Sequence, residues 1–266
     1  MTPNTRQRRL LDELRAQQSA SVESLARSLA VTAQTVRRDV RLLAGAGLLE
    51  RFHGGVALPE SSTENIGYAQ RQSINAAGKR RIAAALAAQV PDGCSLILNI
   101  GTTTEAVAHA LRARRGLRVV TNNLNVAAIL ADHADEVIVA GGVVRPRDRG
   151  IVGEAAVDLI RQFKVDIAVI GISSIEPDGT LRDFDYREVK VAQAIIAQAR
   201  EVWLAADHTK FGRRAMVELG HVSQVDALYT DAPPPEPLAA ILREAQVRCE
   251  IAADAATDAA DAAAAP

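Results

Sequence analysis

The strongest constraint on the fold is an alternation of short apolar runs with helical segments that begins near Gly78. Runs of about four to eight β-branched or aliphatic residues between turn residues predict buried strands, and most of the segments between them have the composition of helices. The predicted strands are 95–100, 117–120, 136–140, 165–170, 202–206 and 227–230. This alternation predicts an α/β domain, in which a mostly parallel sheet carries helices on its faces.

The ends of these predicted strands share a common chemistry. In parallel sheets ligands bind beyond the carboxyl ends of the strands, and here those ends hold glycines, hydroxyls, amides and one lysine. Glycines let backbone amides approach a ligand closely, and the polar side chains donate hydrogen bonds. The candidate effector-binding residues are Gly101, Thr102, Thr103, Thr104, Thr121, Asn122, Asn123, Gly141, Gly142, Gly171 and Lys210.

The turn 101–104 is the most informative of these segments. It follows a predicted strand and opens a helix, and Thr102 with Glu105 matches the S/T-x-x-E capping pattern. The amides and the dipole of such a helix favour an anion at its N-terminus. An equally good interpretation is that the threonines only cap the helix. Lys210 follows another buried strand beside Arg213 and Arg214, so it is a candidate second cation for a phosphate group.

Other kinds of site are disfavoured. No Walker A or G-x-G-x-x-G sequence is present, which argues against an ATPase or a nicotinamide dehydrogenase. The histidines lack metal-ligand spacing and Cys94 stands alone, so we expect no metal and no cofactor. Asp183, Asp185 and Glu188 would suit the acid and base chemistry of a sugar-phosphate isomerase. We favour the interpretation that they cap and solvate the helix starting near Tyr186, and we expect no catalytic residues.

Net charge is unevenly distributed along the chain. The total is −1, yet residues 1–60 carry nine arginines against six acidic side chains, a net charge of +3. Residues 250–266 hold four acidic side chains and no basic one, and residues 252–266 are mostly alanine and aspartate. Such a segment lacks the apolar surface that offsets the entropy of ordering, so we expect a disordered acidic tail there.

The basic N-terminal segment has the pattern of a winged helix-turn-helix. Three short helices are predicted from three apolar stripes. The stripes are Leu10, Leu11 and Leu14, then Val22, Leu25, Ala26 and Leu29, then Val36, Val40 and Leu43. Thr32 is the expected N-cap of the third helix, and Gln34, Arg38 and Arg41 lie opposite its apolar stripe with Arg37 beside them. Amide and guanidinium groups pair with base edges in the major groove.

A hairpin is predicted after this third helix. Segments 48–52 and 56–58 flank His53 and two glycines, and Arg51 and His53 at the tip would reach DNA phosphate or the minor groove. The candidate DNA-binding residues are therefore Thr32, Gln34, Thr35, Arg37, Arg38, Arg41, Arg51 and His53. Alternatively, the arginines only solvate the helix, with Asp39 as their local counter-charge, and His53 is an ordinary turn residue.

Both halves of the chain resemble one protein family. Residues 35–40 (TVRRDV) and 47–55 (GLLERFHGG) resemble the DNA-binding signature of the DeoR family of bacterial sugar-metabolism repressors. Residues 99–103 (NIGTT), 120–127 (VTNNLNVA) and 207–213 (DHTKFGR) resemble the sensor domain of the same family. The resemblance covers about residues 5–250. Two departures are Val56, where the family usually has alanine, and Asn99, where it usually has aspartate.

The resemblance implies a DNA-binding transcriptional repressor of carbohydrate or polyol metabolism genes. Its sensor domain would be similar in fold to ribose-5-phosphate isomerase and coenzyme A transferases. A small phosphorylated effector, glycerol 3-phosphate or a similar phosphorylated polyol or sugar, would release a homo-oligomer (dimer or tetramer) from operator DNA. The loss of a carboxylate at Asn99 would favour an anionic ligand and alter recognition of its hydroxyls. The alternatives are an isomerase or acyl-CoA transferase on the same sheet, or a head that binds protein.

These observations also predict the organisation and location of the chain. We expect a winged helix-turn-helix at 1–58, a linker at 59–77, the effector-sensing α/β domain at 78–251 and the acidic tail at 252–266. No apolar run reaches the roughly 18 residues of a membrane helix, and no signal-peptide core is present. Two cysteines fit a reducing compartment, so we expect a cytoplasmic protein without a membrane partner.

Overall fold

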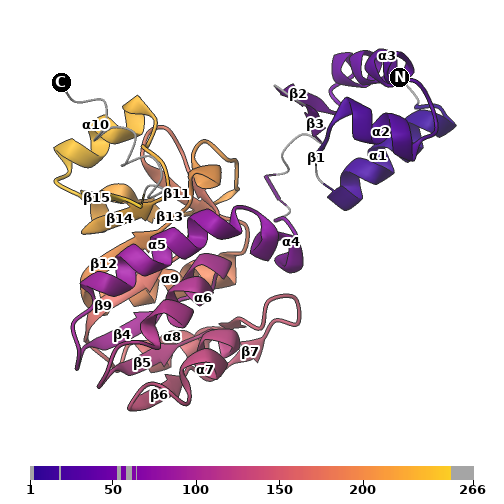
Figure 1. Cartoon of the computed structure of the whole chain (residues 1–266). Coiled ribbons are helices and arrows are strands. Elements are labelled where there is room, and N and C mark those ends of the chain that lie inside the picture. The colour runs from indigo at the N-terminus through magenta and orange to yellow at the C-terminus, as the bar shows by residue number, and fades with distance from the viewer. Residues whose placement is uncertain (1–2, 18, 53–54, 58–61, 64, 253–266) are drawn as a thin grey trace. The chain divides into compact units, whose positions relative to one another are not determined.

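The computed structural model describes residues 3–17, 19–52, 55–57, 62–63 and 65–252. The chain divides into two compact units, residues 1–61 and 62–266 (Figure 1). We call the first unit the head and the second the sensor domain, and each is described by itself.

The head contains three helices and a three-stranded antiparallel sheet. Its elements are α1 (Thr5–Gln17), β1 (Ser19–Ala20), α2 (Val22–Ser28), α3 (Ala33–Gly45), β2 (Glu50–Phe52) and β3 (Gly55–Ala57). The predicted N-cap is confirmed, because the Thr32 hydroxyl accepts a hydrogen bond from the Thr35 amide at 3.3 Å. The predicted apolar stripes also form the core of the head. β1 was not predicted: it pairs antiparallel with β3, with Ser19 opposite Ala57.

The sensor domain is built on a parallel sheet of seven strands in the order β15-β14-β12-β9-β4-β5-β6. The strands are β4 (Ser95–Leu98), β5 (Arg118–Thr121), β6 (Glu136–Val139), β9 (Val165–Ile170), β12 (Ala199–Ala205), β14 (Ala227–Thr230) and β15 (Arg248–Ile251). All six predicted strands are present, and the α/β class is confirmed. The additional strand β15 lies at one edge, where its mostly exposed residues give it no apolar signature.

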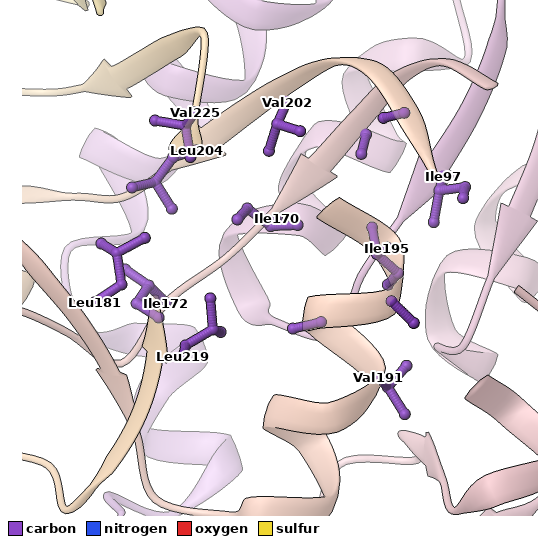
Figure 2. Packing of buried hydrophobic residues seen from close by; sticks show 14 of the residues in the cluster. Ile97, Ile170, Ile172, Leu181, Val191, Ile195, Val202, Leu204, Leu219 and Val225 are labelled. Carbon is purple, nitrogen blue, oxygen red and sulfur yellow. The ribbon is translucent and has the colours of Figure 1, made fainter. Parts of the chain in front are cut away.

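Helices cover both faces of this sheet because alternate strand residues point to opposite sides. Leu96 and Leu98 of β4 belong to the core under α5 (Ala76–Gln89), α6 (Thr102–Leu111) and α7 (Leu124–Leu130). Ile97 between them belongs to the other core, which α8 (Glu154–Ile160), α9 (Tyr186–Ala197) and α10 (Glu236–Glu244) cover. Figure 2 shows this second core, with Ile170 of β9 and Ile195 of α9.

Several short elements lie outside the seven-stranded sheet. They are the helix α4 (Tyr68–Ser73), the hairpin β7 (Val143–Val144) and β8 (Ile151–Val152), and the antiparallel sheet of β10 (Ser174–Ile175), β11 (Thr180–Asp183) and β13 (Val217–His221). Two 3-10 turns, His208–Lys210 and Val222–Gln224, complete the fold. Among the described residues, no helix is long and apolar enough to cross a membrane.

The strand order reverses beside β4, and this reversal indicates where a ligand would bind. From β4 the chain proceeds outward to β5 and β6, and then returns to add β9 on the other side of β4. Connections therefore diverge at the carboxyl ends of β4 and β9, and such a reversal opens the crevice in which α/β proteins bind ligands. Gly101 and Gly171 follow these two strands.

Candidate DNA-binding face and anion site

The outer face of α3 presents amide and guanidinium groups to solvent. Val36, Val40 and Leu43 are at most 3% exposed, whereas Gln34, Arg38 and Arg41 on the opposite side are exposed, as the periodicity predicted. Neither Gln34 nor Arg38 forms a side-chain hydrogen bond or ion pair with any residue that the structure describes. Their donors are therefore available to a partner.

Asp39 is not the local counter-charge of these arginines, and that interpretation is wrong. Its side chain is 3% exposed and points into the head, where Arg6 Nε of α1 donates to it at 2.6 Å and Gln7 Nε2 at 3.1 Å. This hydrogen bond and charge raise the pKa of Arg6. On the outer face Arg37 pairs with Glu23 at 3.3 Å, but both side chains are more than half exposed, so this pair is weak.

A groove of about 470 Å³ lies between α2, α3 and the hairpin. Arg37 and Arg41 of α3 and Arg51 of β2 line it together, so the structure brings three of the predicted DNA-binding arginines to one surface. Arg51 lies opposite Val56 within the hairpin rather than at its tip. His53 falls outside the described residues, and its role remains a prediction.

The N-terminus of α6 is arranged differently from the predicted capping box. Gly101 is the N-cap, at a φ of 153° that favours glycine, and no side chain caps the helix. The Thr102 hydroxyl instead donates to the Arg71 carbonyl at 3.4 Å, and Glu105 accepts from the Tyr68 hydroxyl at 2.8 Å. Sequence alone could not reveal these partners because they lie more than 30 residues away. The first-turn amides therefore have no side-chain cap, which suits an anion.

Most of the predicted hydroxyls and amides at the strand ends are engaged in holding the loops. Thr103 is 6% exposed, and four further residues have no exposed surface: Thr104, Thr121, Asn122 and Asn123. The Thr104 hydroxyl donates to the Asn99 carbonyl at 2.9 Å, and the Asn122 amide donates to the Ile151 carbonyl at 3.0 Å. These contacts give the residues a structural role, and a direct role in ligand binding remains a prediction.

The predicted glycines fall in two places. Gly101 and Gly171 lie together at the strand reversal, where a methyl group on Gly171 would be 3.5 Å from the Ile100 carbonyl. Gly141 and Gly142 are exposed and follow β6, two strands away from β4. A methyl group on Gly142 would lie 2.7 Å from the Val152 carbonyl, so close packing against β8 explains that glycine without a ligand.

Two cations near α6 were not predicted from sequence. Part of the predicted linker forms α4, and Arg71 of this helix places Nη2 3.3 Å from Asp148 Oδ2. The structure describes no hydrogen-bond partner for its buried Nε. Lys79 of α5 is 3% exposed, and its Nζ donates to the carbonyls of Arg71 and, at 2.6 Å, Ile74. An arginine in a polar segment and a lysine in an alanine-rich helix carry no signal that distinguishes them from surface residues.

Lys210 lies in the same electrostatic environment as Arg71 and Lys79, and we call these three cations the positive region. Burial and the positive charges of Arg213, Lys79 and Arg71 lower the pKa of Lys210 to about 8, against the opposing effect of Asp207. Among the described residues, Lys210 Nζ has no hydrogen bond or ion pair. Lys210 is thus repelled by three other cations, and an anion bound among them would relieve that repulsion.

Carboxylates gather around Arg145 next to this positive region. The Arg145 guanidinium contacts Asp148 at 2.7 Å, Asp185 at 2.9 Å and Glu188 at 2.7 Å. Asp185 caps α9, as predicted. Glu188, expected to solvate the helix, is mostly buried, and burial together with the charge of Asp183 raises the pKa of Glu188 to about 7. The described residues contain no group of three or more side chains suited to a metal ion.

Comparison with known proteins agrees with this architecture. Residues 6–62 match the DeoR-like helix-turn-helix domain, and residues 74–232 match the DeoR C terminal sensor domain. The chain is 46% identical to the glycerol-3-phosphate regulon repressor of Escherichia coli K12, across 94% of this chain and 100% of that protein. It is 47% identical to the repressor of the same name from Haemophilus influenzae, across 79% of this chain and 82% of that one.

Among solved structures, the chain is similar to ribose 5-phosphate isomerase A of Methanocaldococcus jannaschii, with a TM-score of 0.38 and 15% identity over 52% of this chain and 55% of that one. The two domain matches together span most of the described residues, and they agree with the winged head and the parallel sheet. The chain therefore belongs to the DeoR family.

Proposed function

We propose that the protein is a transcriptional repressor of carbohydrate or polyol metabolism genes. Its head binds double-stranded operator DNA, and a small phosphorylated effector bound to the sensor domain weakens that binding. Family membership supports the overall role, as do the names of the relatives as glycerol-3-phosphate regulon repressors.

The observation that carries the DNA-binding part is the outer face of α3. Arg38 and Gln34 point away from the core and have no side-chain partner in the described part of the chain, and Arg37, Arg41 and Arg51 line an adjacent groove. A helix with such a face fits the major groove, where arginine pairs with guanine and glutamine with adenine, while neighbouring arginines contact phosphates. Because one head offers few contacts, we propose that a homo-oligomer, a dimer or tetramer, binds a symmetric operator.

The positive region beside α6 supports a phosphorylated effector. Arg71, Lys79 and Lys210 supply charge, and the first-turn amides of α6 supply donors without a side-chain cap. A phosphomonoester carries close to two negative charges and three acceptor oxygens, which matches this donor set. We propose glycerol 3-phosphate, or a similar phosphorylated polyol or sugar, as the effector and no further cofactor.

The DNA-binding part is tested with an operator fragment that the protein itself selects from a random DNA library. Arg38→Ala is expected to weaken binding by about 1–3 kcal/mol, or roughly 5- to 150-fold. Arg161→Ala is the matched control, because it removes the same charge from an exposed position of the sensor domain. Equal operator affinities of Arg38→Ala and wild type would show that α3 does not recognise the bases.

The enzymatic alternative is tested in parallel. Wild-type protein is incubated with phosphorylated sugars and assayed for isomer formation, with Lys210→Ala beside it. Our proposal predicts no turnover by either protein. Turnover by the wild type that Lys210→Ala abolishes would instead establish an isomerase.

A further inference from the structure

Helix α4 and the residues beside it are docked on the ligand edge of the sensor domain. Asn65 Nδ2 donates to Ser173 Oγ beyond β9 at 3.3 Å, the Tyr68 hydroxyl donates to Glu105 of α6 at 2.8 Å, and Arg71 contacts Asp148 at 3.3 Å. In the sequence this segment lies directly between the head and the first long helix of the sensor domain. The short helix α4 thus lies at the edge of the sheet where the ligand site is proposed. In the sequence it also belongs to the segment that connects the head to the sensor domain.

The docking of α4 is polar throughout. None of its six residues is buried, so the helix contributes nothing to either apolar core of the sensor domain. Segments held mainly by a few hydrogen bonds, with few buried apolar contacts, lie at the low end of local stability within a fold. A ligand that competes for one of these polar contacts can therefore shift α4 without disturbing the sheet.

Arg71 is the contact that a phosphate can take over at least cost. Its Nε is buried and has no hydrogen-bond partner among the described residues, and its Nη2 shares Asp148 with Arg145. Arg145 holds both oxygens of Asp148 by itself, at 3.2 Å from Nε and 2.7 Å from Nη2. Losing Arg71 would leave this buried carboxylate paired, so the usual penalty for breaking a buried ion pair does not arise.

The backbone of Arg71 ties α4 to the positive region. Its carbonyl accepts hydrogen bonds from Lys79 Nζ and from the Thr102 hydroxyl in the first turn of α6. A phosphate at the uncapped end of α6 is thus next to the turn that carries Arg71. Tyr68 fixes the other end of the helix, since its hydroxyl also accepts from Asn125 Nδ2 at 2.9 Å.

We propose that α4 couples the effector site to the head, with Arg71 as a direct ligand of the effector phosphate and Tyr68 as a positioning residue. The docked α4 belongs to the DNA-binding state. A phosphomonoester at the end of α6 draws the Arg71 guanidinium away from Asp148, and α4 changes its docking. This inference rests on the proposed function, and it adds the residues through which the effector acts.

The test uses the full-length protein, the selected operator fragment and glycerol 3-phosphate, with inorganic phosphate as a second probe. Effector affinity is measured by calorimetry, and operator affinity by fluorescence anisotropy with and without effector. For Arg71→Gln we expect effector affinity to fall at least about tenfold, because a charge-assisted phosphate contact is lost. Operator affinity without effector should fall by no more than about tenfold, because one polar contact of α4 is lost while Arg145 keeps Asp148 paired.

Arg147→Gln is the matched control. Arg147 lies beside the same carboxylates, 3.9 Å from Asp148 and 3.3 Å from Asp185, and within the described part of the chain no hydrogen bond or ion pair joins its side chain to α4. This variant should bind and respond to the effector like wild type. Circular dichroism and thermal unfolding of each variant verify that it folds.

Tyr68→Phe should change operator affinity and effector affinity in opposite directions. Removing its hydroxyl destabilises the docked state, so operator affinity without effector should fall. Effector affinity should rise, and the two factors together should multiply to about three- to tenfold. A purely structural role for Tyr68 would leave effector affinity unchanged or lower it, and that result would overturn the coupling by α4.

Different results would refute the coupling by α4 and the proposed function. If wild type is released by glycerol 3-phosphate while Arg71→Gln is released at the same concentrations, the coupling inference is wrong and the proposed function stands. If wild type binds the operator but neither glycerol 3-phosphate nor any other phosphorylated polyol or sugar releases it, both fall together.

Discussion

Asp39 of α3 accepts a 2.6 Å hydrogen bond from Arg6 Nε of α1, and this contact turns the one carboxylate of α3 away from its arginines. The pair joins two helices of the head while the outer face of α3 keeps its positive charge. One buried contact thus serves both the stability of the head and its capacity to bind DNA.

Loss of the Asp39 carboxylate should therefore destabilise the head without removing any donor from the outer face of α3. Asp39→Ala leaves Gln7, which is 3% exposed, without this acceptor, at an expected cost of about 1–3 kcal/mol. Asp39→Asn retains an acceptor oxygen and should cost less. Hydrogen exchange of the α1 and α3 amides measures the change, and equal exchange in Asp39→Ala and wild type would contradict it.

The groove arginines should contact phosphate and not bases. Arg37→Ala, Arg41→Ala and Arg51→Ala are each expected to lower affinity for operator and random DNA alike, and to reduce the slope of log K against log salt by about 1. Arg38→Ala should lose more affinity for operator than for random DNA. Anisotropy titrations at several salt concentrations separate the two classes, and unchanged salt slopes would remove the groove from the interface.

Effector affinity should depend on pH through Lys210. Only the protonated amine attracts phosphate, and the pKa of Lys210 lies near about 8 because of burial and its cationic neighbours. Affinity for glycerol 3-phosphate should therefore decrease at least about threefold as the pH rises from about 7.5 to 9. Calorimetry in buffers of different ionisation enthalpy should also show proton uptake on binding.

Lys210→Met is the control for this pH dependence. The variant should bind the effector more weakly and lose most of the decrease above pH 8. Without ligand it should be more stable than wild type by about 1–3 kcal/mol near neutral pH, because a partly buried cation among other cations is removed. Weaker binding accompanied by the full wild-type pH profile would assign the titration to another group, such as Lys79.

Glu188 should make the sensor domain less stable as the pH rises. Its pKa is raised by burial and by Asp183 to about 7, above the ordinary value of 4.5. The folded state therefore holds this proton more tightly than the unfolded state, so the contribution is present below about pH 4.5 and is lost as the pH rises through 7. Glu188→Gln should flatten this part of the curve of unfolding free energy against pH. A variant as pH-dependent as wild type would refute the assignment.

The sequence was sufficient to predict the elements that have a regular pattern of apolar residues. Apolar runs located β4, β5, β6, β9, β12 and β14, and the helical period located the buried and exposed sides of α3. Thr32 was predictable as a cap because its partner, the Thr35 amide, lies three residues away. These signals are local, so one sequence suffices to detect them.

The candidate site was predicted only in part because its decisive contacts join distant residues. Tyr68 and Glu105 are 37 residues apart, and Arg71 and Asp148 are 77 apart. α4 buries no residue and so has no apolar pattern, which made its segment resemble a linker. The capping box at Thr102 failed for the same reason, since its glutamate has a better partner elsewhere in the fold.

The most direct test of the account is the affinity of the full-length protein for its selected operator fragment during a titration with glycerol 3-phosphate. Fluorescence anisotropy at fixed salt and pH measures both binding equilibria in one sample. Saturating effector is expected to lower operator affinity at least about tenfold, a coupling of about 1.4 kcal/mol. Operator binding that stays the same with glycerol 3-phosphate and with every other phosphorylated polyol or sugar would contradict it.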